Sequence, residues 1–202
     1  MKIRSLLLCT ATLLVSCLVS NASVTGVTYA DDGDGAVICP VYTWPGGDTV
    51  SIYGDQYGWP GHVLGTISTD SDLDPTLTLA SAFDNDTPFV WTDYHVNIFM
   101  NHVFTVVPAS VSVFNDSIGD WTGGLTQQAT STGTNYMAKL DFYAGTPVPI
   151  GDTLYFSYAI QFSGATSFSF TQEMIPTPEP STLSLLAGGA LLLGARTLRR
   201  KH

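Results

Sequence analysis

Apolar and polar residues alternate over several short stretches of the chain, with the period of a β-strand that buries one face. The clearest stretch is residues 153–162. One of its faces carries Leu154, Phe156, Tyr158, Ile160 and Phe162, and the other carries Tyr155, Ser157, Ala159 and Gln161. Residues 94–100 and 136–142 alternate in the same way, and Gly, Pro, Asn or Asp bounds each stretch. The pattern therefore predicts a series of short strands joined by turns.

No window before residue 180 shows a sustained 3.6-residue apolar period, so helices are not expected in the core. The predicted fold class is all-β, an antiparallel β-sandwich of jelly-roll or Ig-like type. The chain has 202 residues and 45% of them are hydrophobic. This length is enough for one mid-sized domain with terminal extensions, and we expect the domain to span residues 23–174.

Residues 1–22 have the layout of a secretory signal peptide. Basic Lys2 and Arg4 precede an apolar run, and small residues follow, which predicts cleavage after Ala22. An alternative stays open, because Leu14–Cys17 resembles a bacterial lipobox in which Cys17 would be lipidated. Cleavage near Ala22 is the preferred reading, since the residues after Cys17 are more apolar than is usual in lipoproteins.

The charge of the chain excludes one class of partner. The formal net charge is −10, and Lys139 is the only lysine or arginine between the two termini. An acidic domain of this kind repels the phosphate backbone, so no nucleic acid partner is expected.

Residue types that could support catalysis are scarce. Cleavage near Ala22 leaves Cys39 as the only cysteine, within an apolar strand-like run where a buried, inert thiol is expected. The remaining candidates are His62, His95 and His102, and no short catalytic signature surrounds them. His95 lies on a predicted strand, where a solvent-side or half-buried, hydrogen-bonded role is expected. We therefore expect a protein that is not an enzyme.

Aspartates at alternate positions suggest a possible cation site. They occur in residues 31–35 and in residues 70–74, the latter with Asp70, Asp72 and Asp74. Neither stretch completes an EF-hand, because Pro75 and Ser81 stand where glycine and glutamate are needed after Asp70. The prediction is no cofactor, with structural calcium as the alternative.

The tripeptide Trp-Pro-Gly occurs twice, beginning at Trp44 and at Trp59, and forms a weak internal repeat. Tight hairpin turns explain them most simply. A sugar-stacking platform is the alternative, because exposed aromatic faces can hold a pyranose ring.

The chain ends in a proline-rich spacer, residues 175–181, followed by an apolar segment, residues 182–202. Residues 182–198 would form about 25 Å of helix, near the lower limit for crossing a bilayer. The predicted transmembrane helix is followed by a basic anchor that stays cytoplasmic. This anchor consists of Arg196, Arg199, Arg200 and Lys201.

Pro178, Glu179 and Pro180, the short apolar span and the basic tail together resemble the PEP-CTERM sorting signal of exported Gram-negative proteins. The resemblance covers residues 176–202. It implies recognition by an exosortase, passage through an inner-membrane intermediate, and delivery to the cell surface or the exterior. The resemblance indicates the destination of the protein in the cell, but it does not indicate a biochemical activity.

Two classes of function remain. The first is a non-catalytic surface protein associated with the cell surface, a biofilm or extracellular polysaccharide. The second is a secreted carbohydrate-binding module or carbohydrate-active enzyme that would use Trp44, Trp59 or Trp91 with nearby aspartates. The scarcity of glutamate and the lack of a catalytic motif favour the first.

Overall fold

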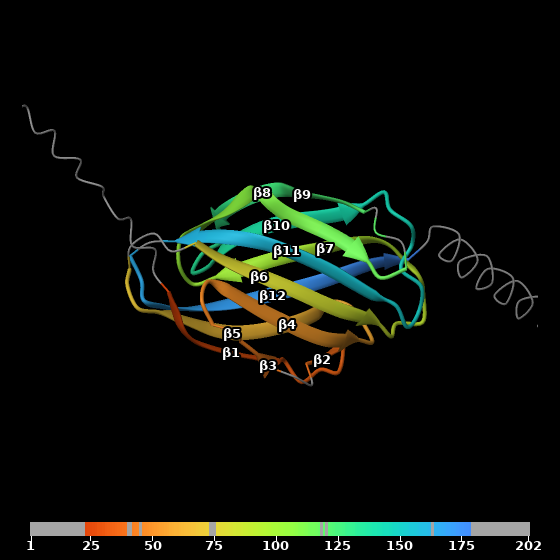
Figure 1. Ribbon diagram of the computed structural model, residues 1–202, viewed down its shortest axis with the longest axis horizontal. Coiled ribbons are helices and arrows are strands. Elements are labelled where there is room, and N and C mark those ends of the chain that lie inside the picture. Colours follow the sequence, from red (N-terminus) through yellow and green to blue (C-terminus); the bar gives the residue numbers. More distant parts are fainter. Residues whose placement is uncertain are drawn as a thin grey trace, which may run out of the picture.

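The computed structural model describes residues 23–39, 42–44, 46–72, 76–117, 119, 121–162 and 164–178. Over these residues the chain forms twelve β-strands in two sheets, with no helix (Figure 1). The all-β prediction is confirmed, and the two layers agree with a sandwich. The predicted signal peptide and C-terminal helix lie outside this described part. Within it, no helix has the length and apolar character needed to span a membrane.

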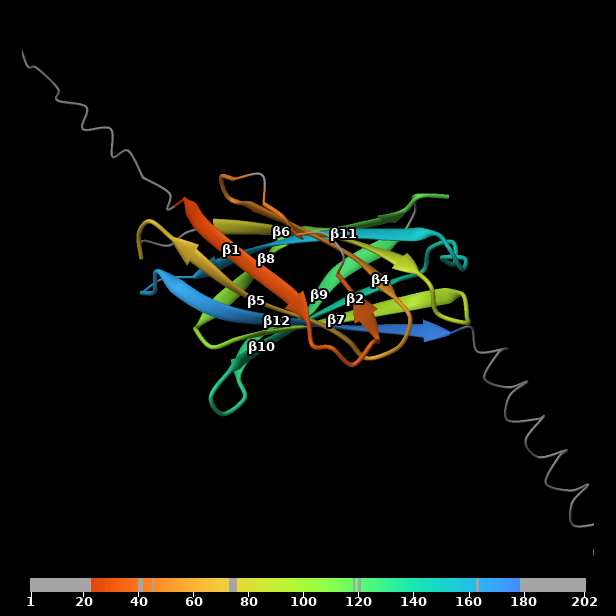
Figure 2. The same cartoon turned by 90° about the horizontal axis from the view of Figure 1, so that it is seen from below.

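The two sheets are nearly equal in size, and a view turned by 90° separates them (Figure 2). Sheet A has the order β1 (Val24–Asp31), β5 (Gly61–Thr69), β12 (Ser167–Pro178), β7 (Trp91–Met100), β10 (Tyr136–Tyr143) and β9 (Thr122–Ser131). Sheet B has the order β2 (Val37–Ile38), β4 (Thr49–Gln56), β6 (Thr76–Asn85), β11 (Thr153–Phe162) and β8 (Phe104–Asn115), and β3 (Tyr42–Thr43) pairs with β4. Only the β4–β6 pair is parallel among the described strands.

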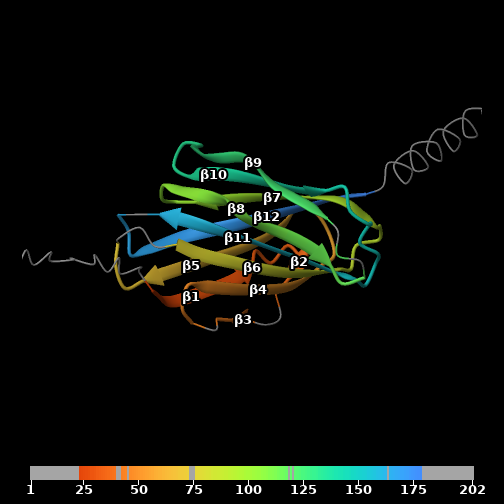
Figure 3. The ribbon, with the colours of Figure 1, turned by 45° about the horizontal axis from the view of Figure 1, so that its top comes forward.

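The antiparallel pairs are nested around the β8–β9 connection. β7 pairs with β10, β6 with β11, and β5 with β12, so the chain resembles one long hairpin rolled into two layers. β9 lies at one margin and β3 at the other (Figure 3). This nesting favours the jelly-roll form of the predicted sandwich over the Ig-like form.

A glutamine joins the two sheets at the β8–β9 side. The Val106 N–H donates to Gln128 Oε1 at 2.7 Å, and Gln128 Nε2 donates to the Val106 carbonyl at 2.9 Å. The side-chain amide of Gln128 thus makes the two hydrogen bonds that the backbone of a neighbouring strand would make with Val106. Because the edge of β8 would otherwise present unpaired groups, this contact protects that edge.

The core follows the predicted alternation. The apolar set of β11 is buried, as are Tyr94, Val96 and the inward residues of β10. Ala159 is also buried, although it lies on the opposite phase of β11. The irregular part of β8 covers it, and Ser110 Oγ accepts a hydrogen bond from the Ala159 N–H.

Tyrosine–glutamine pairs cross the core between the sheets. Tyr94 in sheet A donates to Gln56 Oε1 in sheet B at 2.6 Å. Tyr158 in sheet B donates to Gln172 Oε1 in sheet A at 2.9 Å. Burial raises the pKa of both phenols, so the hydroxyls remain protonated donors. The pairs supply partners for polar groups that the apolar core would otherwise leave unsatisfied.

The last strand runs past the predicted domain end at Met174. Residues 175–178, which the sequence predicts as the start of a proline-rich spacer, continue β12 and pair with β7. Beyond Met174 the strand has lost β5 as a neighbour. A strand with one neighbour tolerates proline when the missing N–H faces the open side, which allows Pro176 and Pro178 at this place.

Candidate functional site

A cluster of titratable side chains lies where β1 ends against β5, and we call it the His62 cluster: Asp32, Asp34, His62 and Glu173. Asp32 and Asp34 belong to the loop after β1, where Gly33 and Gly35 both have a φ of 80°. Each aspartate turns the chain by accepting a backbone N–H. Asp32 Oδ1 accepts from the Asp34 N–H at 3.1 Å, and Asp34 Oδ1 accepts from the Ala36 N–H at 2.7 Å.

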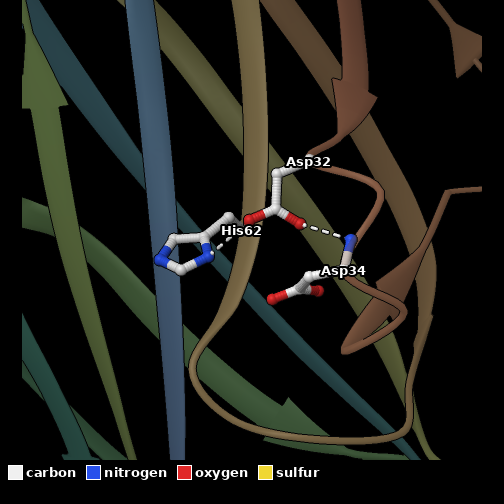
Figure 4. Close-up of side chains that lie close together, drawn as sticks. All are labelled: Asp32, Asp34 and His62. Atoms are coloured by element: carbon white, nitrogen blue, oxygen red, sulfur yellow. Dashed lines mark hydrogen bonds and ion pairs between the residues drawn. The ribbon is translucent and has the colours of Figure 1, made fainter.

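His62 lies between the carboxylates of Asp32 and Glu173. Figure 4 shows the Asp32 side of this arrangement, with Asp34 nearby. Its Nδ1 lies 2.9 Å from Asp32 Oδ2, an ion-pair distance that lacks the alignment of a hydrogen bond. Its Nε2 lies 3.4 Å from Glu173 Oε1 on β12. The His62 side chain is 25% exposed, so the imidazole is held by its neighbours but remains accessible.

The cluster continues as a polar row across the outer face of sheet A. The strand register aligns His62 with Glu173, Glu173 with Asn97, and Asn97 with Lys139. Asn97 Nδ2 donates to Glu173 Oε2 at 2.5 Å, so both oxygens of the only glutamate in the described residues have partners. A carboxylate engaged on both oxygens is poorly placed to act as a free catalytic base.

The loop geometry perturbs one carboxylate. The hydrogen bond from the Asp34 backbone N–H is the main cause that holds the pKa of Asp32 below its usual value, and the charge of His62 adds to it. Since the folded pKa is depressed, the stabilising contribution of Asp32 is present above the unfolded pKa and is lost as the pH falls through the folded pKa.

The ligand atoms of Asp32, Asp34 and His62 lie within 4.8 Å of one another, which is close enough to surround a cation. Two carboxylates and one imidazole suit a transition metal better than calcium, which takes six to eight oxygens. However, one oxygen of each aspartate already holds the loop. The loop therefore has its backbone satisfied without an ion.

We expect a chelator to leave the melting temperature of the full-length chain unchanged, because the backbone of the acidic loop is held by its own aspartates. Circular dichroism melts in calcium, in zinc and in EDTA would measure this. His62→Asn is the control variant for zinc. A fall of more than about 3 °C in EDTA, roughly 1 kcal/mol for a domain of this size, would contradict the expectation.

The other predicted histidines and aspartates lie apart from this cluster. His95 Nδ1 lies 2.8 Å from Asp141 Oδ1 on β10, and its side chain is 42% exposed, which confirms the half-buried, hydrogen-bonded role. His102 lies in the connection between β7 and β8.

Asp70 accepts a hydrogen bond from the Ser23 N–H at 2.8 Å, so it ties the start of β1 to the end of β5. Asp74 lies outside the described residues.

The three tryptophans named for the alternative of sugar binding differ in their exposure. Trp91 is fully buried and donates from Nε1 to Thr87 Oγ1 at 2.9 Å, so the reading of Trp91 as a sugar-binding residue is wrong. Trp44 is partly buried against the core. Trp59 is 52% exposed and meets the Phe89 ring edge-on at 4.8 Å. Of these three, Trp59 alone offers a largely open aromatic surface.

Cys39 has the inert character that the sequence predicts. Burial is the main cause that raises the pKa of its thiol to about 12, and the charges of Asp31 and Asp55 add to the shift. A thiol with this pKa is almost wholly protonated at neutral pH, so it is a poor nucleophile. In the described part of the chain, no hydroxyl or thiol is hydrogen-bonded to His62.

Comparison with known proteins identifies a sorting motif at the C-terminal end of the chain. Residues 176–201 match the family model of the PEP-CTERM protein-sorting motif. This confirms the resemblance that Pro178, Glu179 and Pro180 indicated. Neither the curated proteins nor the solved structures contain a match to the chain.

Proposed function

Because residues 176–201 carry a PEP-CTERM sorting motif, we propose that the chain is an exported protein of a Gram-negative bacterium, processed at its tail by an exosortase and sorted to the cell surface. Its β-sandwich would act there without catalysis, in association with a biofilm or extracellular polysaccharide. The position of the motif carries the proposal. The matched segment begins at Pro176 inside β12, so the sorting signal directly continues a strand of the folded domain.

Several observations support a non-catalytic domain. Glu173 is engaged by His62 and Asn97, and Cys39 has a raised pKa. The Asp32–Asp34 loop is organised by its own backbone hydrogen bonds. A secreted carbohydrate-active enzyme is the alternative. Release of reducing ends from a polysaccharide, lost when one aspartate is replaced by asparagine, would favour that alternative.

We expect the mature surface form to lack residues 1–22 and the basic tail, because both ends carry processing signals. Intact-mass analysis of protein recovered from the cell surface would measure this. Replacing Glu179 with glutamine removes the charge of the motif at nearly constant size, so this variant should keep its tail. Arg199 and Arg200 in the mature product of the unaltered chain would contradict the proposal.

A further inference from the structure

The outer face of sheet B carries three parallel rows of side chains, each of which crosses β4, β6 and β11 and ends in β8 or directly after it. The strand register sets these rows. The central, aromatic row is Tyr53, Ala82, Tyr155 and Phe114. The row on one side is acidic, with Asp55, Asp84, Thr153 and the neighbouring Asp116. The row on the other side is small and hydroxylated, with Ser51, Ala80, Ser157 and Ser112.

The small side chains of β6 leave a hollow in this face. A cavity of about 230 Å³ lies over Ala80 and Ala82, between Tyr53 on one side and the Phe114–Tyr155 pair on the other. The rings of Phe114 and Tyr155 are stacked, with centroids 4.7 Å apart and planes 5° apart. Tyr53 is 44% exposed and Phe114 is 48% exposed, so the aromatic walls are open to solvent.

The size of the hollow suits one sugar ring. Tyr53 and Tyr155 stand on strands separated by β6, so their backbones are about 10 Å apart. A ring held between two aromatic faces needs about 7–8 Å, which is two contacts of about 3.5–4.0 Å. A second hollow of about 300 Å³ shares Tyr53, Ala82 and Tyr155 and extends over the acidic row. The two hollows together give room for more than one ring.

The polar groups around the hollow are rich in acceptors. Asp84 Oδ1 is fixed by the Thr153 hydroxyl at 2.5 Å, and Asp116 Oδ2 accepts from the Tyr155 hydroxyl at 3.3 Å. Burial is the main cause that raises the pKa of Asp55, and the charges of Asp84 and Asp86 also raise it. A ligand whose hydroxyls donate to these crowded carboxylates would relieve their repulsion.

We propose that this face, centred on Tyr53, Ala82 and Tyr155, binds a neutral polysaccharide, with a pyranose ring between the aromatic walls and its hydroxyls donating to Asp55 and Asp84. An anionic ligand would be repelled, because the lone lysine or arginine of the described residues, Lys139, lies on sheet A. β6 and β11 are paired on both sides, so the centre of the face offers no free edge for an added peptide strand. A purely apolar ligand would leave the acceptors without donors.

This binding face deepens the proposed function by naming a class of ligand. It rests on the proposed surface location only because that location decides where the protein meets a polysaccharide. Affinity gel electrophoresis of the purified full-length chain would test it, with gels containing mixed-linkage β-glucan, galactomannan or dextran, and with alginate and chitosan as charged probes. We expect retardation by at least one neutral polymer and none by alginate. Since sorting is measured by mass, failed binding would leave the sorting proposal intact.

Matched variants locate the site. Tyr53→Ala should weaken retardation at least about tenfold, because one aromatic wall is lost. Ala82→Leu should weaken it to a similar extent, because the larger side chain would fill the hollow from its floor on β6. Tyr143→Ala is the control, because Tyr143 is 47% exposed on β10 of sheet A. Melting curves would confirm that each variant is folded. Binding to chitosan alone, no binding to the neutral polymers, or equal binding by folded Tyr53→Ala and Ala82→Leu would each overturn the inference.

Discussion

Asn85→Asp should lower the free energy of unfolding by about 3–5 kcal/mol, although the two side chains have nearly the same size. Asn85 is fully buried at the end of β6. Its Nδ2 donates to the carbonyls of Phe89, at 3.0 Å, and of Val148, at 2.9 Å. Aspartate would place a negative charge against these two acceptors, with no cation nearby among the described residues. The lost hydrogen bonds add to this cost, although the Val148 carbonyl keeps the Trp91 N–H as a donor.

The acceptor side of Asn85 adds to this effect. Asn85 Oδ1 accepts from the Thr87 hydroxyl at 2.6 Å, and that hydroxyl in turn accepts from Trp91 Nε1 at 2.9 Å. The network therefore fixes the buried indole. Urea unfolding of the full-length chain, followed by tryptophan fluorescence, would measure the loss. Asn135→Asp is the control, since Asn135 is exposed in the β9–β10 turn. A difference below about 1 kcal/mol between the two variants would contradict the assigned role.

Ending the chain at Met174 instead of Pro178 should cost about 2–4 kcal/mol of stability. The four lost residues pair with β7, and Pro176 among them is buried. The Thr92 hydroxyl donates to the Thr177 carbonyl at 3.3 Å, and this contact would also be lost. The expected value combines the burial of one apolar side chain with two or three hydrogen bonds.

Urea unfolding of two chains, both beginning at Ser23 and ending at Met174 or Pro178, would measure this difference. A third chain that begins at Ala22 and ends at Pro178 provides a control for a change of terminus in general. Equal midpoints for the Met174 and Pro178 chains would show that residues 175–178 add nothing to the fold. If the difference is found, exosortase cleavage after Pro178 keeps the domain at full stability, whereas cleavage before Ile175 weakens it.

The alternation of side chains predicted the strands, because it reflects only which residues face the core. The buried set of β11 and the half-exposed His95 could be read in this way. The burial of Trp91 could not be predicted in this way, because the alternation of β7 is irregular at its start. Two residues, 92 and 93, separate buried Trp91 from buried Tyr94, whereas strict alternation would place one residue between them. The register that sets His62 beside Glu173 joins residues 111 positions apart, and local patterns do not encode such pairing.

The aromatic row did leave a signal in the sequence. Tyr155 lies on the solvent phase of an alternating strand, where a large ring is unexpected unless it has a partner or a ligand. What could not be read is that Tyr53, from a strand about 100 positions earlier, faces it across Ala82. The parallel pairing of β4 with β6 places Tyr53 beside Ala82. Parallel strands are not joined by a short hairpin, so the local sequence does not predict this pairing.

The last strand of the domain occupies an interior position in its sheet, between β5 and β7. During synthesis and export the N-terminal strands emerge first, yet sheet A cannot close until residues 167–178 have followed them. Assembly must therefore wait for almost the entire chain, and the early strands need protection from aggregation in the meantime. Since the sorting motif begins within the same strand, completion of folding and presentation of the tail to its processing enzyme become nearly simultaneous events.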